Sequence, residues 1–274
     1  PYGHRRPRED VTGLETRPQG RMPGALDAAK DLGRSFKLWY ERITLSFVFA
    51  STWWALGFVA AQLALANPLL LVPAVFLLAA ASCMALCMAN GPVHKEDFEM
   101  RSFFRSFMKS YVRFLGLFSL SAVALLLYIP LMLYLPTVPG LLTYLAFGVA
   151  TWVGLFSFVT AAYAAGIIVE RDERLFSAIK KGFLLMIDNP GYSLASGALM
   201  LFLAFAGYLL PLASMAWPSW AYLVLVIIGV FLYGSVNAYF LALAVRRLLS
   251  RYALDRKSGR EEMQEELAGG GKVN

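Results

Sequence analysis

The sequence predicts an all-α polytopic membrane protein with six transmembrane helices arranged as three hairpins. Residues 43–93, 114–169 and 189–245 contain no Asp, Glu, Lys or Arg. Each of these runs has room for two helices of roughly 20–25 residues and a turn, and about 20 apolar residues span the hydrocarbon core of a bilayer. Only 16% of the 274 residues are charged, whereas a soluble domain has about a quarter. The apolar runs therefore fit a membrane better than a soluble core.

Turn signals near the middle of each run divide it into two spans. They are Asn67-Pro68, the Pro- and Gly-containing residues 136–140, and Trp217-Pro218-Ser219-Trp220. The predicted spans cover about residues 43–66, 69–90, 114–135, 141–169, 193–215 and 219–245.

The basic residues predict the topology. Lys and Arg number nine before residue 43, five between 93 and 114, four between 169 and 189, seven after 245, and none in the hairpin turns. By the positive-inside rule, both termini and both long loops are cytoplasmic. The net charge of +7 is thus a topological signal, and no nucleic-acid partner is expected.

Polar tails flank the predicted membrane domain, which covers residues 34–250. The N-terminal tail, residues 1–33, is rich in Arg, Pro and Gly and is expected to be disordered and cytoplasmic. The C-terminal tail, residues 251–274, is charged and also expected in the cytoplasm.

A short amphipathic helix is expected before each hairpin, as a threefold repeat starting near residues 34, 101 and 174. The candidate surface residues of the second and third copies are Arg101, Arg105, Lys109, Arg113, Lys180 and Lys181. In the third copy an apolar stripe is formed by Phe176, Ile179, Phe183 and Ile187. Two interpretations remain open. The helices either dock a protein partner or lie on the inner leaflet with their basic side toward anionic headgroups.

The spans contain no Asp, Glu, Lys, Arg or His, which disfavours a transporter or protease that depends on a buried carboxylate. Gln62, Thr160 and Asn237 are the candidate intramembrane polar contacts, either as interhelical hydrogen bonds or as substrate contacts. Cys83 and Cys87 lie one turn apart and are interpreted as small packing residues. The sequence contains no Walker loop, dinucleotide-binding motif or nucleophile elbow. We therefore expect no catalytic, metal or cofactor site, and we expect that the protein is not an enzyme.

Several motifs follow one another between about residues 32 and 247. They are an aromatic lead-in before the first span, Val72-Pro73-Ala74, Asp97-Phe98 with residues 103–107, Ile168-Val169-Glu170 with residues 175–183, and Asp188-Asn189-Pro190. Their order resembles the YesL-like family of bacterial membrane proteins (domain of unknown function 624). The resemblance implies a multi-pass protein of the bacterial inner membrane, of unknown activity and often associated with carbohydrate-uptake systems.

Three functions remain in competition. The leading hypothesis is a non-enzymatic accessory or scaffold protein for a carbohydrate transport system, with an ATP-driven (ABC-type) transporter or other membrane subunits as partners besides the lipid bilayer. The second is a small permease with a pore between the hairpins, lined by Gln62, Thr160 and Asn237. The third is a structural subunit of a larger membrane complex.

Overall fold

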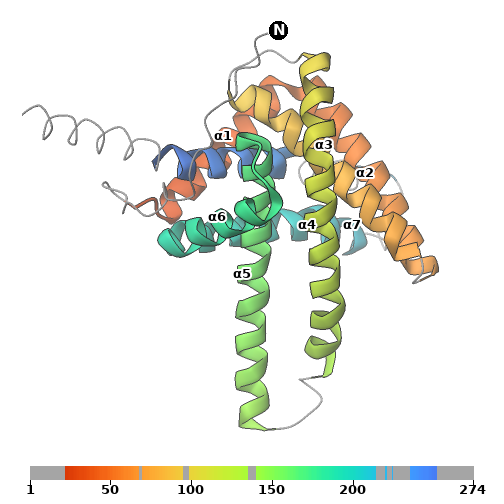
Figure 1. Ribbon diagram of the computed structural model, residues 1–274, viewed down its shortest axis with the longest axis vertical. Coiled ribbons are helices and arrows are strands. Elements are labelled where there is room, and N and C mark those ends of the chain that lie inside the picture. The colour runs from red at the N-terminus through yellow and green to blue at the C-terminus, as the bar shows by residue number, and fades with distance from the viewer. Residues whose placement is uncertain are drawn as a thin grey trace, which may run out of the picture. The chain divides into compact units, whose positions relative to one another are not determined.

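The predicted all-α class is confirmed by the computed structural model, which describes residues 22–67, 70–94, 99–134, 140–213, 220, 224 and 235–251 (Figure 1). Contacts divide the chain into two units. One is Pro23–Val245, and the other combines Pro1–Met22 with Arg246–Asn274. The sections below concern the unit Pro23–Val245.

Seven labelled helices and one further helix over residues 235–251 make up the described chain. The labelled helices are α1 (Ala25–Glu41), α2 (Ile43–Ala66), α3 (Leu71–Val93), α4 (Met100–Tyr134), α5 (Leu141–Arg171), α6 (Leu175–Asp188) and α7 (Pro190–Ala213). Within the described residues, α3, α4 and α5 are long and apolar enough to cross a membrane. Much of the predicted sixth span lies outside the described residues.

The first helix begins inside the stretch predicted to be a tail. α1 starts at Ala25, after Gly24. The Asp27 carboxylate accepts a hydrogen bond from the Gly24 backbone N–H at 3.1 Å, which satisfies one of the donors left open at a helix start. The helix buries Ala28, Asp31 and Ser35. Small and polar residues thus form its inner face.

The second amphipathic segment and the third span form one helix rather than two. α4 runs without interruption for 35 residues. The chain between the basic segment and the apolar segment, Arg113-Phe114-Leu115, contains no Gly or Pro that would end a helix. In the third copy, by contrast, α6 ends at Asp188 and Pro190 opens a new helix.

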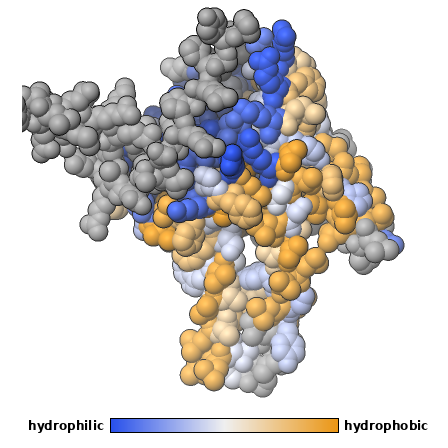
Figure 2. All heavy atoms as spheres, in the orientation of Figure 1, coloured by the Kyte–Doolittle hydropathy of each residue, from blue (hydrophilic) through white to orange (hydrophobic). Residues whose placement is uncertain are grey.

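α4 and α5 form a hairpin whose lower part in Figure 1 carries exposed apolar side chains. In Figure 2 this part shows hydrophobic residues mixed with residues of intermediate hydropathy, and the most hydrophilic residues gather toward the other end of the hairpin. α4 and α5 approach each other closely at Gly154, because a Cβ at this position would lie 2.5 Å from the Tyr128 hydroxyl oxygen. Such exposed apolar helix surfaces are typical of contact with lipid.

Candidate functional site

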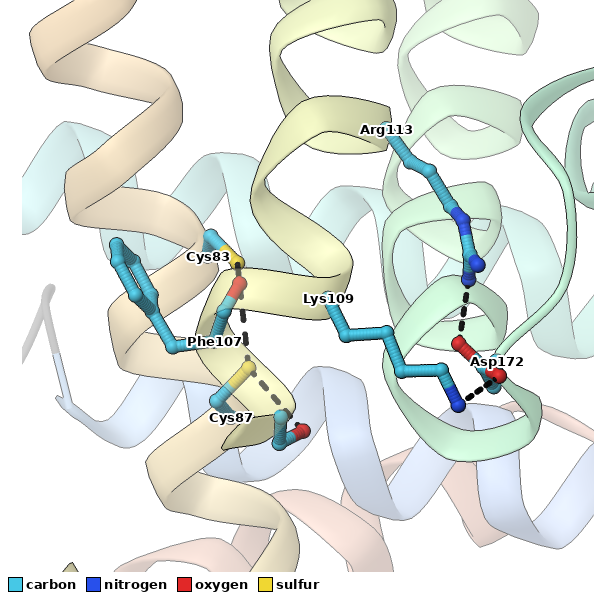
Figure 3. A network of polar contacts seen from close by, with 7 residues as sticks. Cys83, Cys87, Phe107, Lys109, Arg113 and Asp172 are labelled. Carbon is cyan, nitrogen blue, oxygen red and sulfur yellow. Dashed lines mark hydrogen bonds and ion pairs between the residues drawn. The ribbon is translucent and has the colours of Figure 1, made fainter. Parts of the chain in front are cut away.

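The charged turn after α5 binds α4 through Asp172. Its carboxylate forms ion pairs with Lys109 and with Arg113, the latter at 2.6 Å between Oδ1 and Nη1 (Figure 3). Asp172 has a left-handed backbone conformation with φ of 55°, which Asp and Asn tolerate better than most residues. This conformation ends α5 and turns the chain toward α6.

The same turn also binds α3 and α6. The Glu170 carboxylate lies 2.8 Å from the Nε2 atom of His94, the residue that follows α3. Glu173 forms an ion pair with Lys181 of α6 and accepts a hydrogen bond from the Ser177 hydroxyl at 2.8 Å. We call the acidic residues Glu170, Asp172 and Glu173, together with these partners, the charged junction. Each acid binds a different helix, so the junction ties three helices to the end of α5.

Two carboxyl groups of the junction have pKa values that are shifted in the direction that stabilises the charged form. Partial burial alone would raise the pKa of Asp172, but the hydrogen bonds and charges of Lys109 and Arg113 outweigh it, and the pKa is lowered. For Glu173, burial is again outweighed, here by Lys181 and Ser177, and the pKa is lowered.

Acidification is therefore expected to weaken the junction. A carboxyl group with a lowered folded-state pKa contributes stability above its unfolded pKa of about 4, and that contribution is lost as pH falls through the lower folded value. We expect the wild type to lose more thermal stability in mild detergent between about pH 5 and pH 3 than a variant with Asp172→Asn and Glu173→Gln. Asn keeps the left-handed turn, so the variant isolates charge.

A matched control for this measurement is Glu41→Gln. Glu41 pairs with Lys37 on the surface of α1 at 3.7 Å, in an exposed arrangement that contributes little. Its melting temperature should follow the wild type across the pH range. Equal acid sensitivity of the wild type and the junction variant would contradict the proposed contribution of Asp172 and Glu173.

The six basic residues predicted to form a surface fall into two groups. Lys109, Arg113 and Lys181 are bound within the junction. The second group is exposed and forms no ion pair with any described residue. It consists of Arg101, Arg105 and Lys180. Half of the residues predicted to form a surface therefore pair with acidic residues of the same chain, because a carboxylate that is distant in sequence lies within reach.

Exposed apolar residues accompany Arg101, Arg105 and Lys180 on α4 and α6. On α4, Phe104 and Met108 are 55% and 67% exposed, and both lie on one side of the helix with Val112. On α6, the predicted stripe is exposed at Phe176, Phe183 and Ile187. These two apolar faces, which we call the α4 face and the α6 face, have no partner among the described helices.

The predicted intramembrane polar contacts have different surroundings. The Thr160 hydroxyl of α5 donates to the Met186 sulfur at 3.6 Å, which fits an interhelical contact. The Asn237 Oδ1 atom is buried and accepts no hydrogen bond from the described part of the chain. The Gln62 side chain lies outside the described side chains.

The two thiols are buried, free and placed against α4. Their sulfurs lie 3.9 Å apart, and Ser106 of α4 donates to Cys87 at 3.7 Å (Figure 3). Their position in the contact between α3 and α4 agrees with the interpretation as small packing residues. No three His, Cys, Asp or Glu residues gather as metal ligands within the described ranges.

A buried polar layer was missed by sequence reasoning. Asp31 of α1 is only 1% exposed and accepts a hydrogen bond from the Tyr192 hydroxyl of α7 at 2.8 Å. The buried Tyr163 hydroxyl of α5 donates to Ser193, also on α7, at 3.3 Å. The spacing of Ala28, Asp31 and Ser35 on one helical face was the available signal.

Comparison of the chain with protein-family models, with curated proteins and with solved structures finds no match.

Proposed function

We propose that this chain is a six-span protein of the bacterial inner membrane, with both termini cytoplasmic, that acts as a non-catalytic accessory or scaffold protein for a carbohydrate transport system. The charge-free runs and the exposed apolar hairpin of α4 and α5 support the membrane location. The motif order that resembles the YesL-like family supports the transport association. The α4 face supports the docking role, as follows.

The length of α4 places its N-terminal part beyond the membrane. At about 1.5 Å per residue, Arg113 lies roughly 32 Å along the helix from Tyr134, and Phe104 roughly 45 Å. The hydrocarbon core is about 30 Å thick, and about 40–45 Å with the headgroups. Arg113 would therefore lie just past the core, and the start of the α4 face at the outer limit of the headgroups or in water.

This placement carries the proposal, because lipid cannot cover an apolar surface that lies in the aqueous layer. Phe104 and Met108 are more than half exposed there, and exposed apolar patches rimmed by charge mark protein contacts. The neighbouring Arg101 and Arg105 are exposed and lack an ion pair among the described residues. The complementary surface is an apolar groove with acidic rims on the cytoplasmic side of a transporter subunit or its ATPase.

Site-specific photocrosslinking tests this docking role in native membranes. With a photoreactive amino acid at position 104 or 108, we expect adducts with a subunit of an ATP-driven transport system. A photoreactive group at Leu142, at the far end of the hairpin and exposed, is the control and should yield lipid adducts. Lipid adducts at position 104, or no protein adduct, would contradict the docking role.

Polar substitution gives an independent measurement. The double variant Phe104→Gln, Met108→Gln removes the apolar contact, so recovery of the crosslinked partner in mild detergent is expected to fall by at least tenfold, which corresponds to about 1.4 kcal/mol. Both side chains are mostly exposed, so the fold should persist. Phe176→Gln on α6 is the matched control and should leave recovery unchanged.

One observation favours the permease alternative. The buried Asn237 Oδ1 atom has no hydrogen-bond donor among the described residues, and a polar substrate would supply one. However, the hollow between α5 and α7 has a volume of only about 10 Å³ and is lined mainly by apolar side chains, including Leu155, Phe156 and Val159. The accessory role therefore remains the preferred proposal, and uptake of labelled sugar by vesicles containing only this protein would support the permease instead.

A further inference from the structure

The α6 face and the α4 face lie at different positions along the length of the hairpin formed by α4 and α5. α6 packs on α5 through Gly182, where an added Cβ would lie 2.9 Å from the Thr160 carbonyl oxygen and 3.1 Å from the Ala164 nitrogen. It also reaches α4, because the Leu175 side chain would lie 2.8 Å from a Cβ at Gly116. α6 therefore runs across the hairpin rather than along α5, as Figure 1 also shows.

The crossing point coincides with the expected inner edge of the hydrocarbon core. Along α5, Thr160 lies roughly 29 Å and Ala164 roughly 35 Å from Leu141, at about 1.5 Å per residue. The core is about 30 Å thick. The charged turn begins at Glu170, a further turn and a half along α5. α6 thus lies between the apolar hairpin and the charged junction.

The two sides of α6 differ in the way expected for a helix at the inner edge of the hydrocarbon core. Ala178, Gly182 and Leu185 are buried against the rest of the unit. Phe176, Phe183 and Ile187 point away from it, and Phe176 is 79% exposed. Lys180 falls within the same exposed stripe. The neighbouring Lys181 is bound by Glu173 on the inner side, so the two lysines have separate roles.

We propose that α6 is an anionic-phospholipid-binding helix that lies in the plane of the inner leaflet. Phe176, Phe183 and Ile187 enter the boundary between headgroups and acyl chains, and the Lys180 ammonium group extends to a lipid phosphate. Apolar anchors about 5–10 Å below the headgroups with a basic residue above them are the usual arrangement of interfacial helices. The inference rests on the proposed membrane topology and assigns to α6 a role separate from the docking role of α4.

Spin-label depth measurements on the full chain test the location of α6. Cys83→Ala and Cys87→Ala first remove the native thiols, and a nitroxide is then attached at Phe183→Cys in vesicles of phosphatidylethanolamine and phosphatidylglycerol. We expect Phe183→Cys to be accessible to oxygen and poorly accessible to a water-soluble nickel chelate, at a depth just below the phosphates. Leu126→Cys on α4 is the deep reference, and Met108→Cys is the aqueous reference.

The references separate failure of this inference from failure of the membrane topology. If Leu126→Cys is deep while Phe183→Cys is as accessible to the nickel chelate as Met108→Cys, α6 lies in water and the inference is wrong. Shielding of Phe183→Cys from both reagents would indicate a protein cover and would equally overturn it. Access of the nickel chelate to Leu126→Cys would overturn the proposed topology itself.

Lipid selectivity tests the role of Lys180. One Lys near an anionic surface corresponds to about a fivefold preference. We therefore expect Lys180→Gln to reduce about fivefold the association of spin-labelled phosphatidylglycerol relative to phosphatidylcholine. Lys37→Gln, at an exposed position of α1 in a surface ion pair that contributes little, is the charge-matched control and should have a much smaller effect. Equal effects of the two variants would overturn a specific lipid contact at Lys180.

Discussion

Gly182→Ala is expected to lower the free energy of unfolding by about 1–3 kcal/mol, the usual cost of forcing a methyl group into a packed contact. The new Cβ would meet the backbone of α5 at Thr160 and Ala164. Backbone atoms cannot rotate away as a flexible side chain can, so α6 has to move outward. Thermal unfolding in mild detergent measures the loss, and Gly182→Leu should increase it.

Gly148→Ala is the matched control for this substitution. Gly148 lies in α5, and a Cβ at this position would meet no atom within 4 Å. Alanine in a helix interior is favoured over glycine by roughly 0.5–1 kcal/mol, so the control should match or exceed the wild type in stability. If both glycine variants behave alike, the close contact between α5 and α6 is not formed in the native protein.

Tyr192→Phe is expected to cost about 1.5–3 kcal/mol, the usual range for a hydrogen bond to a charged group. The substitution removes the 2.8 Å hydrogen bond to the carboxylate of Asp31. Asp31 is almost fully buried, so water does not easily replace the lost donor. The consequence is a weaker attachment of α1 to α7, measurable as a lower unfolding temperature and faster amide exchange in α1.

Tyr163→Phe provides the comparison. Its hydroxyl is also buried and donates to the neutral Ser193 hydroxyl at 3.3 Å, so its loss should cost only about 0.5–1.5 kcal/mol. Asp31→Asn keeps an acceptor at position 31 and should be tolerated better than Tyr192→Phe. Equal stabilities of the two Phe variants would contradict a special contribution of the carboxylate.

Helix limits were predictable where the chain contains a clear breaker. The limits of α2, Ile43–Ala66, agree with the first predicted span because Asn67-Pro68 ends the helix. The start of α5 at Leu141 agrees as well, after Gly140 with a positive φ of 150°. The break expected before the third span is absent from α4, since hydropathy changes at Arg113 but helix propensity does not.

Pairing between distant segments was not predictable from spacing. A basic residue at every fourth position of the second repeat copy identifies one face of a helix, but not the carboxylate that meets it. Lys109 and Arg113 meet Asp172 because the hairpin returns α5 to the level of their side chains. Arg101, two turns earlier than Lys109, extends beyond that carboxylate. The hairpin geometry thus decides which basic residues pair with Asp172.

The second and third copies of the predicted repeat also form different helices, a difference that their shared amphipathic pattern does not predict. Pro190 separates α6 from α7 in the third copy, whereas the second copy continues straight into its span. Similar amphipathic patterns thus produce one helix at the proposed membrane surface and one that stands above it.

Because α4 is unbroken, motion at one end of this helix can be transmitted along its length. From Phe104 to Tyr128, roughly 36 Å at about 1.5 Å per residue, the helix contains no proline. A tilt of about 10° imposed at the Phe104 end would move Tyr128 by roughly 6 Å over that length. Tyr128 lies directly on Gly154 of α5, so such a displacement would push the neighbouring helix. Under the proposed topology and docking role, force applied to the N-terminal part of α4 would therefore reach the opposite end of the hairpin through a continuous helix.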